Sequence, residues 1–347
     1  MAEAPLAVLG PTGYTGALVV AEARALGLPL RLVGRSREAL EALAVGEDEV
    51  GVADARDERA LREAFDGAFA VASLAGPFLA IGDAPVAAAL DRRAHYLDTS
   101  GEQAFARLVY ERHAAHAEAN GVAALTSFGF DYVPGDLAAR LAADGLGPLD
   151  ELFAAYSVKR MAASSGTRTT VGHVMSQPVA AWEDGRLVQS RFGASTRTAV
   201  FPFGERTVVE WSGTEPLTVP RHTQVRRVRS YVRAPKLAAR TAAIARLAAP
   251  LVRASGRVGR GPSDARRART EFAVVAEARG AQGRRRVTLT GYDVYRLTAL
   301  LIAHGAAALR AGEVGSAGAL APAEAFDART LIDRLGPLLR IESEVDL

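Results

Sequence analysis

Three regularly spaced glycines near the start of the chain restrict its fold more than any other feature. They follow the apolar run Leu6–Leu9, which has the length and composition of a buried strand, and they precede a helix-forming stretch at residues 14–26. Gly10, Gly13 and Gly16 therefore lie in a strand-loop-helix connection. Glycines at such a connection let the backbone turn tightly, approach a pyrophosphate closely and pack the helix against the strand. A tight turn that binds no ligand is the alternative.

The first 134 residues alternate short apolar runs with helix-forming stretches. The expected strands are 6–9, 30–33, 50–52, 69–74, 96–98 and 122–126, and the expected helices are 14–26, 58–64, 85–92 and 103–120. This alternation predicts a Rossmann domain, an α/β fold with a doubly wound parallel sheet. Polar residues that follow these strands are then expected to meet at one edge of the sheet.

Longer polar and β-rich segments replace this pattern after residue 134. The expected strands are 152–159, 167–174, 196–200, 207–211, 271–278 and 286–292. They predict a second α+β domain at residues 135–296, built on a mainly antiparallel sheet, with a basic helix and loop at 235–269. Helices at 297–309 and 328–339 are expected to pack back on the first domain. Two domains suit a chain of 347 residues, because one hydrophobic core rarely organises that many.

Composition excludes several classes of protein. The chain has no cysteine, which excludes disulfides, thiolate zinc sites and cysteine nucleophiles. Its six histidines show no convincing spacing with carboxylates, so no metal site is predicted. No basic leader and no apolar run of bilayer-spanning length is visible. A cytoplasmic location is therefore expected.

Basic residues dominate the segment 221–269. The formal charge of the whole chain is only +3, from 42 basic and 39 acidic residues, which does not predict nucleic-acid binding. A solvated surface is one interpretation of the segment. The other is a docking surface for an acidic carrier protein with a tethered acyl chain, or for an anionic lipid surface, which would put the protein at the membrane periphery. Nucleic acid is disfavoured because aromatic residues are sparse there.

The second expected strand ends in Val33, Gly34, Arg35 and Ser36, with a basic side chain where an NAD-binding domain usually has an acidic one. Arg35 can pair with a 2′-phosphate, and Ser36 can donate a hydrogen bond to the same group. A merely solvated arginine is the alternative. Asp54, after the third strand, can accept a hydrogen bond from the adenine amino group or cap the next helix. This pattern favours NADPH over NADH.

Loops after the later strands are expected at the same edge of the sheet. The loop 75–78 either contacts the ribose and nicotinamide or is a structural turn. Polar clusters at 96–102 and 127–136 follow the next two strands. The residues predicted to bind the nucleotide are Gly10, Thr12, Gly13, Tyr14, Thr15, Gly16, Arg35, Ser36, Asp54, Ala75, Gly76, Pro77, Phe78, Ser100, Gly101 and Phe130.

These motifs, taken in order with their spacing, resemble the saccharopine dehydrogenase-like NADP-binding superfamily. The branch that contains trans-acting enoyl reductases and saccharopine dehydrogenase-like oxidoreductases is the most similar, with further likeness at 165–167, 291–299 and 320–323. Two departures are Tyr132, where the branch often has serine, and Gly135, where a small polar residue is common. Residues 153–286 match only in scattered places, so the substrate pocket is not carried over.

Hydride transfer needs a proton donor near the reacting atoms. Tyr132 is the first candidate, because a neutral phenol can donate and Asp131 beside it can orient it. His173, in the β-rich domain, is the second. The alternatives are a half-buried tyrosine, a structural histidine and an aspartate that caps the following helix.

The sequence therefore predicts an NADPH-dependent reductase of a small-molecule or carrier-tethered substrate. Reduction of an activated carbon–carbon double bond is what the resemblance to enoyl reductases implies, in lipid, polyketide or other secondary metabolism. The alternatives are an imine or carbonyl reductase of the same fold, and a non-catalytic partner protein that binds NADPH. An exposed sheet in the second domain favours a homodimer.

Overall fold

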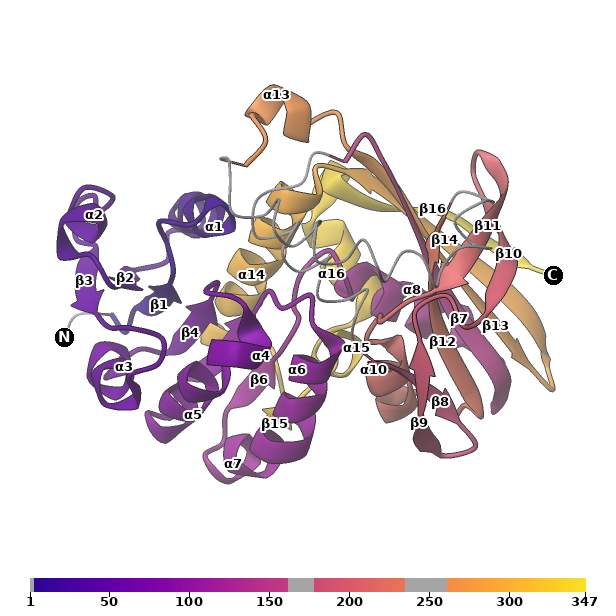
Figure 1. Cartoon of the computed structure of the whole chain (residues 1–347), viewed down its shortest axis with the longest axis horizontal. Helices are drawn as coiled ribbons and strands as arrows, with labels where there is room; N and C mark the ends of the chain where they lie inside the picture. The colour runs from indigo at the N-terminus through magenta and orange to yellow at the C-terminus, as the bar shows by residue number, and fades with distance from the viewer. Residues whose placement is uncertain (1–2, 162–177, 235–260) are drawn as a thin grey trace. The chain divides into compact units, whose positions relative to one another are not determined.

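The computed structural model describes residues 3–161, 178–234 and 261–347 (Figure 1). The chain divides into two compact units, each made of separate stretches of sequence. The first unit comprises Met1–Ser100, Ala104–Phe130 and Tyr295–Leu320, and the second comprises Gly101–Gln103, Asp131–Val294 and Ala321–Leu347. Within the described ranges, no helix is both long enough and apolar enough to cross a bilayer.

A seven-stranded parallel sheet forms the centre of the first unit, in the order β15-β6-β5-β4-β1-β2-β3. Its strands are β1 (Leu6–Leu9), β2 (Leu30–Gly34), β3 (Glu49–Val52), β4 (Ala70–Ser73), β5 (His95–Asp98), β6 (Ala123–Leu125) and β15 (Gly318–Ala319). Each of the six expected runs corresponds to a strand, so the predicted doubly wound sheet is confirmed. Because β1 lies between β2 and β4, the strand order reverses at β1, and ligands of such folds bind at the carboxyl end of this position.

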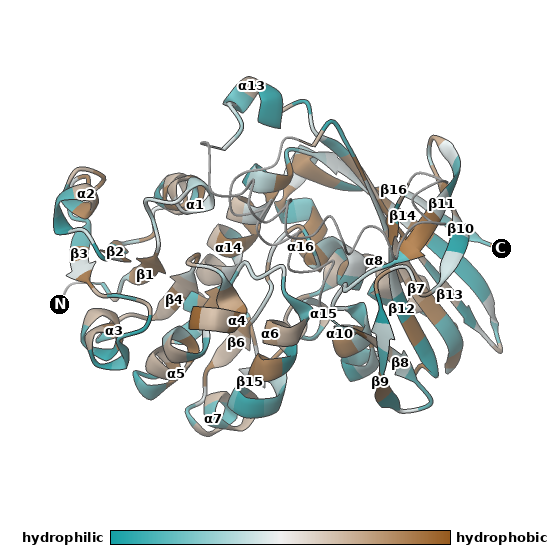
Figure 2. Ribbon diagram, viewed as in Figure 1, coloured by the Kyte–Doolittle hydropathy of each residue, from teal (hydrophilic) through white to brown (hydrophobic). Residues whose placement is uncertain are grey.

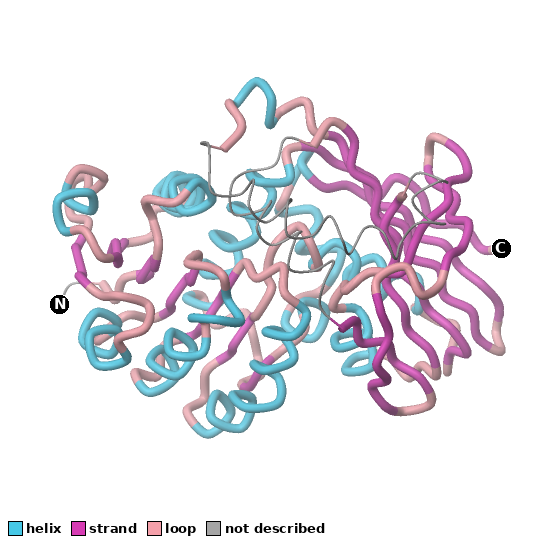
Figure 3. The backbone as a smooth tube through the Cα atoms, in the orientation of Figure 1, coloured by secondary structure: helices cyan, strands magenta, loops and turns pink. Residues whose placement is uncertain are grey.

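Helices cover both faces of this sheet (Figures 1 and 3). They are α1 (Tyr14–Ala25), α2 (Arg37–Glu41), α3 (Glu58–Phe65), α4 (Phe78–Ile81), α5 (Asp83–Asp91), α6 (Gln103–Leu108), α7 (Ala114–Ala119) and α14 (Val294–Arg310), with a π-helical turn Val109–His113 between α6 and α7. Leu61 and Phe65 of α3 and Leu90 of α5 are buried in one apolar cluster with the strands. All four residues of β1 are buried, and Figure 2 shows this strand as hydrophobic.

A nine-stranded sheet forms the second unit, in the order β10-β11-β12-β7-β13-β14-β16, with β8 paired to β12 and β9 to β8. Its strands are β7 (Leu149–Lys159), β8 (Pro178–Glu183), β9 (Arg186–Arg191), β10 (Thr196–Phe201), β11 (Gly204–Glu210), β12 (Arg227–Arg233), β13 (Glu271–Gly280), β14 (Gly283–Tyr292) and β16 (Leu339–Asp346). The pair β7–β12 is parallel and the other pairs are antiparallel, which confirms the predicted α+β domain on a mainly antiparallel sheet. The expected strand 167–174 and residues 235–260 of the expected basic helix and loop at 235–269 lie outside the described residues.

The two faces of this sheet have different cores, because successive side chains of a strand point to opposite faces. The helices of the unit are α8 (Val133–Ala143), α10 (Glu215–His222), α13 (Asp264–Arg267), α15 (Pro322–Ala325) and α16 (Ala328–Arg334). Helix α8 packs against β7, β13 and β14. Phe153, Ala155 and Tyr231 join a separate apolar cluster with Phe201 and Val208 of the β10–β11 hairpin, and β10 also contacts β13. The hairpin therefore folds over the second face.

Candidate functional site

The glycine loop between β1 and α1 has the shape that nucleotide binding requires. Gly10 has a φ of +84°, which favours glycine. A Cβ on Gly16 would lie 2.1 Å from the Gly10 carbonyl oxygen and 2.9 Å from Pro11 Cα, so no larger residue fits there. Helix α1 begins at Tyr14 with no side-chain cap and no acidic residue in its first turn. The positive end of the helix dipole is therefore left for an anion.

The side chains of the loop differ in their surroundings. Thr12 is exposed and Thr15 is half-buried. The Tyr14 ring packs edge-on against the ring of Tyr295, with 5.0 Å between ring centroids. A Cβ on Gly10 would lie 3.4 Å from the backbone nitrogen of Ala75, so the loop after β4 lies directly beside the glycine loop. The structure thus brings together two of the predicted nucleotide-contacting segments.

The end of β2 presents a basic side chain to solvent. Arg35 is exposed, and no ion pair joins it to a carboxylate in the part of the chain that the structure describes. Ser36 caps α2, accepting a hydrogen bond from the Ala39 N–H at 3.3 Å. Its hydroxyl proton remains able to donate to another group. The amide of Gly10 donates to the Val33 carbonyl oxygen at 2.9 Å, which ties the glycine loop to this end of β2.

The other predicted contacts have structural roles of their own. Asp54 accepts a hydrogen bond from the Arg56 N–H at 2.9 Å, whereas Asp57 caps α3. The helix-cap alternative for Asp54 is therefore wrong. Gly76 and Pro77 are joined by a cis peptide bond. Phe78 begins α4 and packs on Phe105, with 5.6 Å between ring centroids.

Asp98, at the end of β5, holds two of the predicted loops in place. Its Oδ1 accepts hydrogen bonds from the amides of Ser100 and Ser127, both at 2.8 Å. Its backbone carbonyl accepts a third from the Phe128 amide at 2.7 Å. Gly101 follows Ser100 in the first of these loops. In the second loop the Phe130 amide donates to Oγ1 of Thr298 on α14 at 3.1 Å.

Buried polar atoms gather around Asp98. Asp98 is fully buried, and this burial raises the pKa of its carboxyl to about 6. The hydroxyls of Tyr96 and Thr126 lie near this carboxyl and oppose the rise of its pKa, and both hydroxyl oxygens are buried without a hydrogen-bond partner among the described residues. Within the described residues, the side chains of Ser73 and Ser127 also have buried oxygens without a partner. The carboxyl ends of β4, β5 and β6 therefore meet in a polar cluster, as the strand-end motifs predict.

The catalytic candidates have contrasting environments. Solvent reaches the side chain of Asp131, yet the protein atoms crowded around its carboxyl raise its pKa to about 6. Tyr132 is buried, and its hydroxyl donates to the Ser212 carbonyl oxygen at 3.2 Å. Its ring lies 6.0 Å from the ring of Trp211, centroid to centroid. His173 lies outside the described residues.

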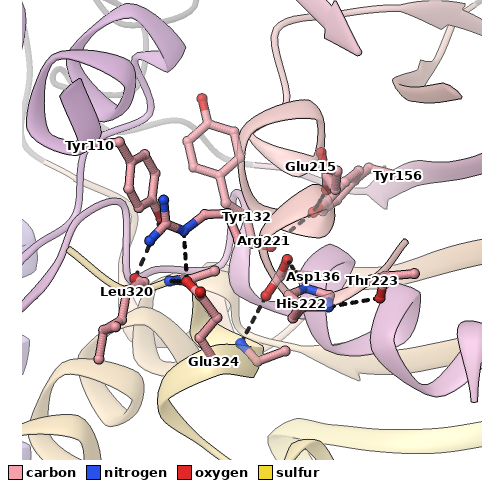
Figure 4. Close-up of polar contacts among 12 residues, drawn as sticks. Tyr110, Tyr132, Asp136, Tyr156, Glu215, Arg221, His222, Thr223, Leu320 and Glu324 are labelled. Atoms are coloured by element: carbon pink, nitrogen blue, oxygen red, sulfur yellow. Dashed lines mark hydrogen bonds and ion pairs between the residues drawn. The ribbon is translucent and has the colours of Figure 1, made fainter. Parts of the chain in front are cut away.

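A buried carboxyl that the sequence did not reveal lies in the second unit (Figure 4). Glu215, the first residue of α10, has no exposed surface. The Tyr156 hydroxyl lies 2.5 Å from Glu215 Oε1 and 3.3 Å from the Tyr132 carbonyl oxygen, and the Ser230 hydroxyl donates to Oε2. Burial raises the pKa of Glu215 to about 7, so both its protonated and its ionised forms exist at neutral pH.

Two glycines make room for this carboxyl. A Cβ on Gly135 would lie 2.0 Å from both Glu215 Oε1 and the Tyr156 hydroxyl oxygen. A Cβ on Gly213 would lie 2.3 Å from Glu215 Oε2. The glycine at position 135, a departure from the related branch, is therefore required by the buried glutamate. Glu-Pro at the start of α10 is a helix-start signal, but nothing in it predicts burial.

A second buried pair lies beside this network (Figure 4). His222 Nε2 is 3.0 Å from Asp136 Oδ1, and both side chains are almost completely buried. Asp136 Oδ2 accepts a hydrogen bond from the Ala323 amide at 2.9 Å. Burial alone would raise the pKa of Asp136, but His222 and this amide hold it below its usual value. The pair links α8, α10 and α15. No group of side chains suited to hold a metal ion occurs among the described residues.

Four of the eight arginines in the described part of the basic segment form ion pairs with carboxylates. Arg221 contacts Glu324, Arg226 contacts Asp184, Arg229 contacts Glu183 and Glu210, and Arg267 contacts Asp264 and Asp293. Residues 235–260 lie outside the described residues. The docking surface at 221–269 stays a prediction.

Comparison with known proteins gives partial sequence matches and structural matches that extend over the full length of the chain. The chain is 34% identical over 151 residues to a lipid droplet localized protein of Caenorhabditis elegans, covering 40% of this chain. It is 32% identical over 152 residues to the human saccharopine dehydrogenase-like oxidoreductase, covering 38% of this chain. Each alignment spans 35% of the relative's length. No model of a known protein family matches the chain.

The solved structure of saccharopine dehydrogenase (L-Glu forming) from Saccharomyces cerevisiae has the same fold, with a TM-score of 0.62 and 12% sequence identity. The match covers 99% of this chain and 100% of that chain. The chain is similar to the saccharopine dehydrogenase-like superfamily in part of its sequence and in its fold. The predicted superfamily is thus confirmed, whereas none of these matches tests the enoyl reductase branch.

Proposed function

We propose that this chain is an NADPH-dependent oxidoreductase that reduces an activated carbon–carbon double bond. The observation that carries the cofactor assignment is Arg35, an exposed guanidinium at the end of β2 with no carboxylate paired to it among the described residues. An acidic residue at this position would bind the 2′-hydroxyl of NADH, whereas a guanidinium favours the 2′-phosphate of NADPH. Ser36 adds a hydroxyl donor beside it.

The residues around the glycine loop fit a dinucleotide. Gly10 has a positive φ that favours glycine, and Gly16 leaves no room for a Cβ, so the backbone can turn tightly and approach a pyrophosphate closely. The uncapped end of α1 would bind the pyrophosphate, and Ala75 beside Gly10 would border it. NADPH, when bound, supplies the hydride. This chain supplies the anion site, the cation for the 2′-phosphate and the loops fixed by Asp98.

Asp131 and Tyr132 are proposed to handle the proton. A raised pKa of about 6 suits the Asp131 carboxyl to donate or accept a proton near neutral pH, and solvent reaches its side chain. Tyr132 would donate from its phenol only after breaking its hydrogen bond to the Ser212 carbonyl oxygen. His173 remains a proposed donor. The pH dependence of turnover in the variants Tyr132→Phe and Asp131→Asn would show which of these two residues donates the proton.

The reaction class rests on family likeness. Curated relatives named as saccharopine dehydrogenase-like oxidoreductases support hydride chemistry. The preference for a double bond conjugated to a carbonyl, in a small or carrier-tethered substrate, comes from the likeness to enoyl reductases. A cytoplasmic protein that also associates with a lipid surface is in keeping with the name of the nematode relative, a lipid droplet localized protein. A homodimer also remains part of the proposal, as the sequence predicts.

The cofactor assignment is tested by titrating the purified protein with NADPH and NADH while following nucleotide fluorescence. Arg35→Asp should weaken NADPH binding at least 10- to 100-fold, the size of a lost charge-assisted hydrogen bond, and should leave NADH binding unchanged or strengthen it, because the new carboxylate can bind the 2′-hydroxyl. Arg37→Asp is the matched control, because Arg37 is an exposed arginine two residues away on α2. Equal effects of the two variants, or no binding of either nucleotide, would refute the assignment.

Turnover distinguishes the enzyme from a non-catalytic NADPH-binding partner. Enoyl, imine and carbonyl acceptors are offered in parallel, and oxidation of NADPH is followed by its absorbance. Consumption with an enoyl acceptor supports the proposal, and consumption only with an imine or carbonyl selects the alternative reductase. Tight NADPH binding without turnover on any acceptor would favour the partner protein.

A further inference from the structure

A cavity of about 220 Å³ opens on the face of the second sheet that the β10–β11 hairpin covers. Its floor is one row of residues across four strands, because Ser157 pairs with Ala273, Ala273 with Thr290, and Thr290 with Arg340. Residues in register lie on the same face of a sheet. Because the side chain of Ala273 is only a methyl group, space is left between the larger side chains of this row, and this space is the cavity. Phe203, in the hairpin turn, forms a wall.

Ser157 has a buried hydroxyl that points to a ligand. The residue is 1% exposed and lines the cavity, and its Oγ has no hydrogen-bond partner in the described part of the protein. Buried hydroxyls are nearly always paired, because an unpaired one has lost its bonds to water without replacement. A ligand oxygen in the cavity would accept the missing hydrogen bond.

Lys159 supplies a positive charge on the same face. It lies two residues along β7 from Ser157, lines the cavity, and has no ion-pair partner among the described residues. Its ammonium lies 4.0 Å from the centre of the Phe203 ring. The guanidinium groups of Arg206 and Arg233 lie 5.1 and 5.7 Å from the same ring. The chain contains only two lysines among its 42 basic residues, and this is one of them.

Two carboxylates also line the cavity and restrict the charge of its ligand. Glu342 is bonded to Arg340 and to the Thr290 hydroxyl, and Glu271 pairs with Arg160 at 3.5 Å. Each of these carboxylates is paired with an arginine, whereas Lys159 is a lining cation without an ion-pair partner among the described residues. Two nearby carboxylates would still repel a phosphate dianion more than a single negative charge. The Lys159 ammonium and the Ser157 hydroxyl can both donate hydrogen bonds to the carboxylate of a ligand. The ring of Phe203 can pack against an apolar part of the same ligand.

We propose that this cavity, the Lys159 cavity, binds a small organic monocarboxylate through Ser157 and Lys159. The proposal is independent of the nucleotide site. It concerns a second ligand, whose carboxylate would accept hydrogen bonds from the serine hydroxyl and the lysine ammonium while its apolar part contacts Phe203.

Titration calorimetry of the full chain with acetate and benzoate tests this site, with benzamide as the uncharged analogue and inorganic phosphate as the other oxyanion. Benzoate should bind saturably, and benzamide and phosphate should not compete with it. Lys159→Met should weaken benzoate binding at least tenfold, and Ser157→Ala should weaken it about tenfold. These factors correspond to the loss of a hydrogen bond to a charged group. Arg279→Met, which removes a cation from the same sheet outside the cavity lining, should leave benzoate binding unchanged.

Thermal unfolding adds a readout that does not need the ligand. Ser157→Ala should leave the midpoint unchanged or raise it, because the variant deletes an unpaired hydroxyl. The proposal is overturned if neither carboxylate binds, if binding survives both cavity variants, or if phosphate displaces benzoate. A lower midpoint for Ser157→Ala would also contradict it, because the hydroxyl would then be paired.

Discussion

Replacement of Glu215 by glutamine should make the protein more stable at alkaline pH. The pKa of this buried carboxyl is raised from 4.5 to about 7. Below pH 4.5 the group is protonated in both the folded and the unfolded chain. Between pH 4.5 and 7 the unfolded chain ionises first, so stability falls as pH rises through this window. A shift of about 2.5 units at about 1.4 kcal/mol each gives a loss of about 3 kcal/mol above pH 7.

Glutamine keeps the shape of the side chain and does not ionise. Its amide oxygen can accept from Tyr156, and its amide nitrogen can donate to the Ser230 oxygen. We therefore expect Glu215→Gln to have nearly the same free energy of unfolding as the unchanged protein at pH 4.5 and about 3 kcal/mol more at pH 8. Other groups with shifted pKa values, Asp98 among them, titrate in both proteins and cancel in the difference.

Urea unfolding followed by tryptophan fluorescence measures this difference. Both tryptophans of the chain, Trp182 and Trp211, belong to the second unit, and the Trp211 ring lies 5.6 Å from the Tyr156 ring. The matched control is Glu118→Gln on α7, an exposed position that should show no pH-dependent difference. The reasoning fails if Glu215→Gln is less stable than the unchanged protein at pH 8, or if the difference is the same at every pH.

Three further changes test the nucleotide loops and the proposed proton donor. Gly16→Ala should abolish NADPH binding in the fluorescence titration, because its Cβ would meet the Gly10 carbonyl oxygen at 2.1 Å; retained affinity would contradict this. Asp98→Ala should lower the free energy of unfolding by about 2–4 kcal/mol in urea, because two buried amides lose their acceptor, whereas Asp98→Asn should recover most of it. Tyr132→Phe should cost about 1 kcal/mol for the bond to Ser212. If the phenol is the proton donor, this variant should also lower kcat at least a hundredfold; a change below threefold would exclude that role.

Local sequence patterns predict the parts of this fold that depend on neighbours in the chain. The runs that form β1, β4 and β6 are buried at every residue, because helices cover both faces of the sheet, and such continuous apolar runs are easy to recognise. β16 (Leu339–Asp346) is not among the expected strands, although Leu339, Ile341 and Val345 alternate with charged residues, a signal of a half-buried strand. The expected helix 328–339 ends earlier, at Arg334, because Gly336 and Pro337 interrupt it.

Long-range packing determines the parts that the sequence did not predict. Nothing near Glu215 in the chain indicates that it is buried. Its environment comes from Gly135, Tyr156 and Ser230, which lie 80, 59 and 15 residues away along the chain. The glycine loop and the strand-end motifs were predictable because a parallel sheet brings the carboxyl ends of its strands to one edge whatever the loop sequences are.

The interleaving of the two units has a practical consequence for anyone who wishes to isolate the nucleotide-binding part. The chain leaves the first unit after Phe130, re-enters it at Tyr295 and leaves it again after Leu320. A fragment that stops near residue 134 would lack α14 and β15, so β6 would become an unpaired sheet edge and the Phe130 amide would lose its bond to Thr298. A single proteolytic nick likewise frees neither unit whole. An autonomous version would have to splice residues 295–320 onto residue 130 through a linker.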